Sequence, residues 1–384
     1  MKRKNKQDKK LKLMYVVQNL NCGGLEKLVV ELAKRVDRDA FRPSICCLLP
    51  PGPQELSKEL TKSKIKVTYM NKKEGVDYAL FLKLANFFRQ EKPDLLHTHS
   101  STANFYASLA ARMAGITNIV NTEHGGIYFE TGRKKLINRL LARMNKKMVC
   151  VSRNLNQDLQ DMGVPKHKLM VIPNGVDINS SGNGVDKRRK RKTLGLGAKD
   201  FVICTVGRLE KVKNQKLLLT AAKKVLKKVP EARIVIVGDG SLRKELENYA
   251  VALRIRDKVI FLGYIEDIAP ILKISDCLVN CSVSETFGLT IIEAMLAEVA
   301  VIATNVGGVK EIVKDEKTGI LVRPNHPDAL AEAILRIKRK PQFAAKMISQ
   351  AKQFVQSNYS IEKMVNSYED LYLSCYNGAG HYHG

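Results

Sequence analysis

Two cations in the second half of the sequence lie where they could bind a phosphate group. Arg208 and Lys213 follow the apolar run 201–206, from which Gly207 separates them. A glycine directly after an apolar run is typical of a turn between a strand and a helix, where both side chains can converge on one point. Charge-assisted contacts to phosphate contribute about 1.5–3 kcal/mol each. The alternative is a solvated basic turn in a basic protein.

Two glutamates follow the third candidate strand after that one. Glu285 lies in a polar segment after the apolar run 277–280, and Glu293 lies where a helix opens near Gly288. Apolar residues surround Glu293 in the sequence, so its carboxylate needs a partner to offset desolvation, and ribose hydroxyls would supply one. The exposed amides of 287–289 could bind a diphosphate. The glutamates could instead complement a helix dipole, but the apolar surroundings favour a ligand site.

The first half offers glycines and histidines after its candidate strands. Gly23 and Gly24 fit a turn that brings backbone amides to a phosphate, and they fit a plain tight turn equally well. His124 precedes a glycine at the end of a strand, which favours contact with a ligand. His97 and His99 lie two residues apart on one strand, but no acidic or cysteine cluster completes a metal site, so we expect none.

Short β-branched runs alternate with amphipathic segments along nearly the whole chain, which predicts parallel sheets covered by helices on both faces. The rhythm restarts after residue 198, so we expect an α/β protein with two Rossmann-like domains. The predicted strands are Lys12–Val17, Ser44–Leu48, Lys66–Tyr69, Leu95–His97, Asn118–Thr122, Met148–Val151, Leu169–Ile172, Phe201–Val206, Arg233–Val237, Val259–Leu262, Cys277–Asn280, Ala300–Ala303 and Gly319–Val322.

The predicted domains are residues 1–177 and 198–357, joined by 178–197. That joining segment is rich in glycine and contains six consecutive bases, Lys187 to Lys192. We interpret it as a solvated connector, since the basic run has no aromatic residues interleaved for nucleic-acid binding.

Composition narrows the class of protein. The 384 residues are 45% hydrophobic and 27% charged, as in ordinary globular proteins, and 65 basic against 38 acidic residues give a net charge of +27. Such a charge favours polyanionic partners. Scattered cysteines, no signal-peptide core and no apolar run long enough to span a bilayer predict a soluble protein in a reducing cytoplasm.

Taken together, the motifs resemble glycosyltransferase family 4, the retaining transferases of GT-B fold that act in bacterial polysaccharide and lipid-linked glycan synthesis. The resemblance covers residues 12 to about 325 in the family's order, and Glu-x7-Glu with an upstream Arg and Lys is its most specific part. Its marks are Gly23-Gly24, His124-Gly125, Pro-Asn-Gly-Val-Asp at 173–177, Gly207-Arg208 with Lys213, Glu285 with Glu293, and Gly-Gly-x-x-Glu at 307–311.

The resemblance implies two Rossmann-like domains facing a central cleft that holds a nucleotide-diphosphate sugar, with no metal and no other cofactor. Arg208 and Lys213 would bind the diphosphate, Glu293 the ribose and Glu285 the sugar hydroxyls, while His124 faces the transferred sugar. The implied catalytic residues are His124, Arg208, Lys213 and Glu285. The implied nucleotide-sugar contacts are Gly23, Gly24, Arg208, Lys213, Glu285, Thr286, Phe287, Gly288, Leu289 and Glu293.

The same resemblance implies that a hexosyl unit passes to a glycan or lipid-linked acceptor with retention of configuration. A UDP-sugar is the first expected donor and GDP-mannose the second. Family members also send a last helix, here about 358–376, back onto the first domain.

A basic amphipathic segment in the first domain bears on where the enzyme works. Residues 133–148 separate apolar from basic side chains at helical spacing. Such a helix usually packs its apolar stripe on a sheet. Contact with an anionic membrane is the alternative, and it would place the enzyme on the inner face of the cell membrane.

Two rival functions remain. A sugar-nucleotide epimerase of GT-B fold would share the architecture and would convert the donor with no acceptor present. A nucleic-acid-binding protein would account for the charge, but the sequence has no recognition motif for one and that function would leave Glu293 unexplained, so we expect no nucleic-acid partner.

Overall fold

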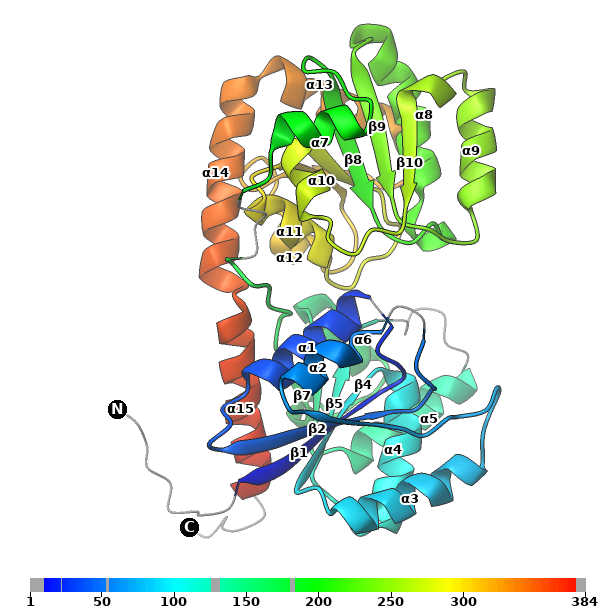
Figure 1. The fold of residues 1–384 in the computed structure, drawn as a ribbon, viewed down its shortest axis with the longest axis vertical. Coiled ribbons are helices and arrows are strands. Elements are labelled where there is room, and N and C mark those ends of the chain that lie inside the picture. Colours follow the sequence, from blue (N-terminus) through cyan, green and yellow to red (C-terminus); the bar gives the residue numbers. More distant parts are fainter. Residues whose placement is uncertain (1–9, 22, 53–54, 126–131, 180–183, 378–384) are drawn as a thin grey trace. The chain divides into compact units, whose positions relative to one another are not determined.

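The computed structural model describes residues 10–21, 23–52, 55–125, 132–179 and 184–377. The chain forms two units, Met1–Gly175 together with Ile361–Gly384, and Val176–Ser360. We refer to them as unit 1 and unit 2. Each is a parallel α/β layer structure (Figure 1), as the alternation in the sequence predicts.

Unit 1 is built on a seven-stranded sheet with the strand order β3-β2-β1-β4-β5-β6-β7. All the strand pairs are parallel. Its elements are β1 (Leu11–Val17), α1 (Gly24–Arg35), β2 (Phe41–Cys47), α2 (Ser57–Lys62), β3 (Lys66–Tyr69), α3 (Ala79–Glu91), β4 (Leu95–His99), α4 (Ser101–Met113), β5 (Ile119–Glu123), α5 (Gly132–Met144), β6 (Lys147–Cys150), α6 (Arg153–Asp161), β7 (Leu169–Val171) and α15 (Ile361–Asn377).

Strand β1 shows why this sheet is covered on both faces. Its side chains alternate, so Leu13 and Tyr15 pack with α1 and α15 while Met14 and Val16 pack with α3 and α4. The last helix, α15, contributes its apolar stripe to the first of these cores through Ile361, Met364, Val365, Tyr368, Leu371 and Tyr372. The chain's final helix is thus an integral layer of unit 1.

Unit 2 is built on a six-stranded parallel sheet with the order β10-β9-β8-β11-β12-β13. Its elements are α7 (Lys187–Thr193), β8 (Phe201–Val206), α8 (Gln215–Lys228), β9 (Ala232–Val237), α9 (Arg243–Ala252), β10 (Val259–Gly263), α10 (Ala269–Ile274), β11 (Cys277–Asn280), α11 (Leu289–Leu296), β12 (Ala300–Thr304), α12 (Val309–Ile312), β13 (Ile320–Val322), α13 (Pro327–Arg339) and α14 (Pro341–Asn358). Helices α8, α9 and α13 close a core over β8, β9 and β12.

All thirteen predicted strands are present, and none of their ends deviates from the prediction by more than three residues. Two other predictions were wrong in detail. The amphipathic segment predicted for 133–148 stops at Met144, because Lys147 already pairs with Val120 as the first residue of β6. On α5, Leu141 is buried, whereas Leu136 and Leu140 are 56% and 50% exposed.

The segment predicted as a solvated connector, 178–197, instead contains helix α7 and is part of unit 2. Asp186 caps the helix by accepting a hydrogen bond from the Arg189 amide. Arg191 then fixes it, donating to the carbonyls of Ile274 and Asp200 and to the Asp276 carboxylate. One anchored arginine therefore holds in place a helix whose other charges repel one another.

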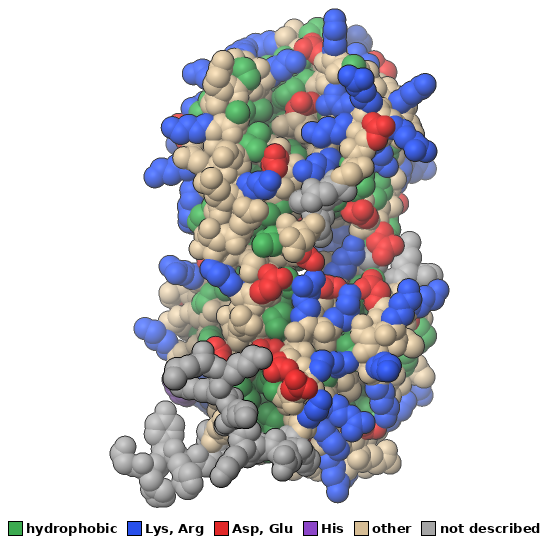
Figure 2. All heavy atoms as spheres, turned by 60° about the vertical axis from the view of Figure 1, so that its left-hand side comes forward, with side chains coloured by type: hydrophobic (Ala, Val, Ile, Leu, Met, Phe, Trp, Pro, Cys, Tyr) green, Lys and Arg blue, Asp and Glu red, His purple; other side chains and the backbone are tan. Residues whose placement is uncertain are grey.

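On the face shown in Figure 2, the positive charge is spread rather than gathered in one patch. In Figure 2, Lys and Arg side chains are scattered over both units, with acidic side chains among them. Within the described part of the chain, no helix is both long and apolar enough to cross a membrane.

Candidate functional site

The strand order of each unit places a topological switch point, where ligands bind in open α/β sheets, beside the predicted residues. In unit 2 the order reverses between β8 and β11, the strands that lead to Arg208 and to Glu285. In unit 1 it reverses between β1 and β4, which lead to Gly23 and end at His99.

The turn after β8 packs tightly against the turn after β9. The Gly207 amide donates to the Val237 carbonyl, and the Leu209 amide donates to the Asp239 carbonyl. Gly238 has a φ of +123°, and a Cβ there would lie 2.0 Å from the Gly207 carbonyl oxygen, so no other residue fits. The two turns therefore form one rigid support for Arg208 and Lys213.

Lys213 and Glu285 meet in a partly buried ion pair. Lys213 Nζ lies 2.6 Å from Glu285 Oε2, and the two side chains are 24% and 14% exposed. The same carboxylate oxygen accepts a hydrogen bond from Ser282 Oγ at 3.1 Å and a longer one from Asn280 Nδ2 at 3.5 Å. Loops from β8 and β11, 72 residues apart in sequence, thus converge on one carboxylate.

The glycine pair after β12 holds the Glu285 loop through its backbone. The Gly308 amide donates to the Glu285 carbonyl at 2.9 Å. Gly307 has a φ of +47°, and a Cβ there would lie 2.2 Å from that carbonyl oxygen. Thr304 at the end of β12 adds a hydrogen bond to the Ser282 carbonyl. The Glu285 carboxylate is therefore presented by a loop fixed from three sides.

The N-terminus of α11 offers unsatisfied backbone amides. Gly288 precedes the helix in a left-handed conformation, with a φ of +101°, and no side chain among the described residues caps the helix. Such a terminus carries a partial positive charge that favours anions. Phe287 is buried beside it, and its ring packs edge-on against Tyr359 at 5.7 Å. Glu293 is half-buried one turn into the helix, as the spacing predicts.

The structure brings some of the predicted cations and acids together and leaves others apart. Lys213 and Glu285 are in contact, whereas the Arg208 side chain is exposed and has no partner among the described residues. The Arg208 carbonyl accepts a hydrogen bond from Gln215 Nε2, which fixes the backbone but leaves the guanidinium available. Thr286 and Leu289 are half-exposed on either side of the buried Phe287 and Gly288.

In unit 1 the glycine pair forms the start of α1. Gly23 is the N-cap residue and Gly24 the first helical residue, and no described side chain caps the helix. The Glu26 carboxylate lies close to this turn, since a Cβ on Gly23 would be 2.4 Å from one of its oxygens. Both interpretations of the pair, a phosphate-binding turn and a tight turn, fit this position.

His124 is half-buried and lies against two buried histidines, a grouping that the sequence did not reveal. His124 Nε2 lies 3.1 Å from His99 Nδ1, and the rings are stacked with centroids 5.4 Å apart. His97 and His99 are fully buried, with ring centroids 4.0 Å apart. Burial lowers the pKa of His124 to about 4 and holds the pKa values of His97 and His99 well below their usual range. All three rings are therefore neutral at pH 7.

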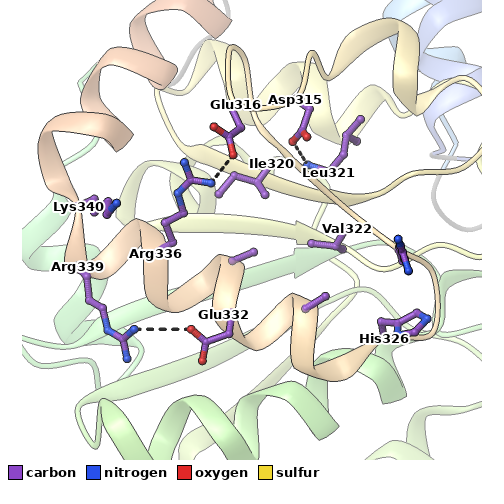
Figure 3. A pocket seen from close by; sticks show the side chains of 13 residues that line it. Asp315, Glu316, Ile320, Leu321, Val322, His326, Glu332, Arg336, Arg339 and Lys340 are labelled. Carbon is purple, nitrogen blue, oxygen red and sulfur yellow. Dashed lines mark hydrogen bonds and ion pairs between the residues drawn. The ribbon is translucent and has the colours of Figure 1, made fainter.

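Two further observations concern other possible sites, a metal site and a second cavity. Within the described ranges, no group of three or more His, Cys, Asp or Glu residues has a geometry that could hold a metal ion. A cavity of about 650 Å³ lies elsewhere in unit 2, between β13 and the end of α13 (Figure 3). Its acidic and basic side chains pair with one another, Arg336 with Glu316 and Arg339 with Glu332, and it contains none of the predicted site residues.

Ser282, Asn280 and Thr304 are site residues that sequence reasoning missed. A signal was present, because Asn280 and Ser282 are polar residues directly at the carboxyl end of an otherwise apolar strand. Two of the tyrosines around His97, Tyr368 and Tyr372, carried no such signal. They lie more than 240 residues away in sequence.

These two sheets, with their switch points and glycine-rich turns, define the GT-B fold of glycosyltransferases. The structure superimposes on Anabaena HepE in complex with UDP and glucose, with a TM-score of 0.86 and 23% identity over 95% of this chain and 100% of that one. It is also similar to WaaG, a glycosyltransferase involved in lipopolysaccharide biosynthesis, with a TM-score of 0.74 and 15% identity over 94% and 99% of the two chains.

Sequence comparison gives the family. Residues 22–180 match the model of Glycosyltransferase Family 4, and residues 186–354 match that of glycosyl transferases group 1. The chain is 32% identical to an Escherichia coli enzyme, UDP-Gal:alpha-D-GlcNAc-diphosphoundecaprenol alpha-1,3-galactosyltransferase, over 77% of this chain and 79% of that one. The protein is an enzyme that belongs to glycosyltransferase family 4, as its motifs suggest.

Proposed function

We propose that this enzyme transfers a hexosyl unit from a nucleotide-diphosphate sugar, most simply a UDP-sugar, to a lipid-linked glycan acceptor. The observation that carries the proposal is the Lys213–Glu285 pair at the unit 2 switch point, beside the uncapped N-terminus of α11. A cation and backbone amides bind the oxygens of a diphosphate, and a carboxylate binds the hydroxyls of a sugar. HepE, which has this fold, binds UDP and glucose.

In this proposal each residue of unit 2 has one role. Lys213 and Arg208 bind the diphosphate, and the α11 amides near Phe287, Gly288 and Leu289 bind phosphate and sugar oxygens. Glu293 binds the ribose hydroxyls and Glu285 those of the sugar. The diphosphate competes with Glu285 for Lys213, so donor binding exchanges one charge-assisted contact for another at little net electrostatic cost.

The chemistry we propose proceeds with retention of configuration. The bond between the sugar's anomeric carbon and the diphosphate oxygen breaks, and its electron pair leaves with the diphosphate. The acceptor hydroxyl attacks the same face, and its proton passes to a phosphate oxygen of the donor. Arg208 and Lys213 stabilise the charge that develops on the leaving diphosphate, which is the largest contribution that fixed charges make to such a step. We propose that these two cations serve in place of a metal ion.

The proposed acceptor follows from the relatives and from unit 1. The Escherichia coli relative is named for an acceptor carried on diphosphoundecaprenol, and so is a Campylobacter jejuni relative that is 25% identical. We propose that Gly23, Gly24 and His124 bind the sugar and the acceptor. Helix α5 of unit 1 carries exposed Leu136 and Leu140, which suit a membrane surface. We therefore place the enzyme on the cytoplasmic face of the membrane.

Thermal-shift measurements with a panel of nucleotide sugars test the donor. A donor that binds only the folded protein at 100 times its Kd raises the free energy of unfolding by about 2.7 kcal/mol. We expect UDP-sugars to raise the unfolding temperature most and GDP-mannose to be the second candidate. Equal shifts from free phosphate and from every nucleotide sugar would contradict a built donor site.

An acceptor-free reaction separates transfer from epimerisation. An epimerase of the same fold would convert the bound nucleotide sugar without any acceptor, whereas a transferase leaves it unchanged or only slowly hydrolysed. We expect an unaltered sugar configuration in the acceptor-free reaction, and an α-linked product when an α-linked donor and a lipid-diphosphate glycan are both supplied.

A further inference from the structure

The imidazole of His124 contacts His99, a residue to which neither the family assignment nor the proposed function gives a role. His124 Nε2 and His99 Nδ1 are 3.1 Å apart, within hydrogen-bond distance, and their planes are inclined by only 24°. Since both rings are neutral at pH 7, each carries one proton on one nitrogen. Their hydrogen bond therefore contains a single proton, donated by one of the two rings. Which ring donates it determines which nitrogen of each ring is protonated, and so sets both tautomers.

His99 itself has no freedom to adjust. It is fully buried, and its other nitrogen, Nε2, has no hydrogen-bond partner within the described structure. The centroid of its ring lies 4.0 Å from the centroid of the His97 ring. A rotation of His99 about χ2 would break the one hydrogen bond that its ring makes among the described residues.

The ring behind His99 is clamped from two elements. His97 Nδ1 lies 2.7 Å from the Tyr372 hydroxyl on α15, and its Nε2 lies 2.7 Å from Thr122 Oγ1 on β5. The Tyr368 hydroxyl lies 3.0 Å from the same Thr122 oxygen. The stack of three imidazoles therefore ends in a polar network that helix α15 completes.

The backbone next to His124 is fixed independently. The Glu123 carboxylate accepts hydrogen bonds from the Gly125 amide at 3.3 Å and from Ser101 Oγ at 2.9 Å. With the main chain held on one side and Nε2 engaged by His99, His124 has one unengaged ring nitrogen, Nδ1, for which the structure gives no partner among the described residues.

We propose that His99 is a positioning residue that fixes the ring plane and the tautomer of His124, so that Nδ1 meets the transferred sugar in one defined hydrogen-bonding state. The catalytic part of this inference rests on the proposed function, in which His124 faces that sugar. A sugar hydroxyl bound to a ring nitrogen of fixed state is held in one orientation, which is how a second layer of residues increases the rate of transfer.

Nitrogen-15 NMR of the histidine rings in the full-length enzyme tests the tautomer directly and needs no substrate. In the unaltered protein we expect His124, assigned by the loss of its signals in H124N, to show one protonated and one unprotonated nitrogen without averaging. In H99L the His124 signals should move toward the average of the two tautomers. H99N, whose side-chain amide can take the place of Nδ1, should keep the single tautomer, and H167N at an exposed histidine should change nothing.

Kinetics then test the catalytic consequence. We expect H99L to lower kcat by about tenfold or more while the KM for the donor changes less than twofold, and H99N to restore most of the loss. Averaged tautomers in the unaltered protein, or a single tautomer that persists in H99L, would overturn the inference, and so would a full kcat in a folded H99L. If a different donor or acceptor proved correct, the NMR result would still stand.

Discussion

Lys213 has two partners in the proposed reaction, and this makes it the most informative single residue to change. It pairs with Glu285 in the structure and would bind the donor diphosphate during transfer. A fixed cation contributes most where charge develops on the leaving group, so its loss should affect the chemical step more than the affinity for the donor.

We expect Lys213→Ala to lower kcat by a factor on the order of 10²–10³, by analogy with the loss of one preorganised donor in other enzymes. The matched control is Lys211→Ala, because Lys211 is two residues away in the same turn and is exposed without a partner in the described structure. Turnover of the nucleotide sugar should be unchanged in the control. Near-normal turnover in Lys213→Ala would remove this residue from the mechanism.

At the residue scale, the sequence was informative where a residue's chemistry contradicts its surroundings. Glu293 is conspicuous because it interrupts an apolar helix, and Lys213 because it follows a buried strand with glycine between them. His99 gave no such signal, since a histidine at the end of a strand has many uses. Its role depends on the positions of His97 and Tyr372, which only the three-dimensional structure supplies.

At the scale of elements, the carboxyl ends of β4 and β5 make unit 1 sensitive to mild acid. The pKa values of His97, His99 and His124 in the folded state lie below the ordinary value near 6.5. Below that pH the unfolded chain binds protons that the folded chain does not, so unfolding is favoured. Stability is complete above about pH 6.5 and declines as the pH falls toward 4, the folded-state pKa of His124.

Urea unfolding followed by far-UV circular dichroism, between pH 7.5 and pH 5.5, measures this decline. Each such histidine can lower the free energy of unfolding by about 1.4 kcal/mol per pH unit in the part of that range below its unfolded-state pKa. H124N should flatten the dependence and H167N, at an exposed position of unit 1, should leave it unchanged. Identical slopes in H124N and in the unaltered enzyme would show that His124 titrates freely.

Most strands were predictable because a strand buried on both faces needs a short, largely apolar run, as in β1, β8 and β11. The partly exposed edge strands β3 and β7 were predictable from the regular alternation of the elements. Helix α7 was not predictable from its own residues, since seven residues with six bases repel one another and have no apolar stripe. Its stability comes from Arg191 contacts to Ile274 and Asp276, more than 80 residues away. Tertiary contacts thus stabilise helix α7, which its local sequence alone disfavours.

At the scale of the whole molecule, the net charge of +27 and the exposed leucines of α5 bear on where the enzyme works. Charge alone attracts any polyanion, whereas a membrane surface also accepts apolar side chains. Leu136 and Leu140 lie one helical turn apart on α5, and Arg143 beside them is exposed. A lipid surface that contains anionic headgroups satisfies both features, and nucleic acid satisfies only the first.

We therefore expect the enzyme to sediment with vesicles that contain anionic phospholipid and much less with neutral vesicles. Binding should weaken between 0.1 M and 1 M salt, because the screening length falls from about 10 Å to about 3 Å. Leu136→Ser with Leu140→Ser should reduce binding at fixed salt, whereas Val251→Ser, which alters an equally exposed side chain of unit 2, should not. If vesicle binding is absent, or is insensitive to both salt and the α5 leucines, the hypothesis of membrane binding is rejected. The enzyme would then recognise only the soluble part of its acceptor.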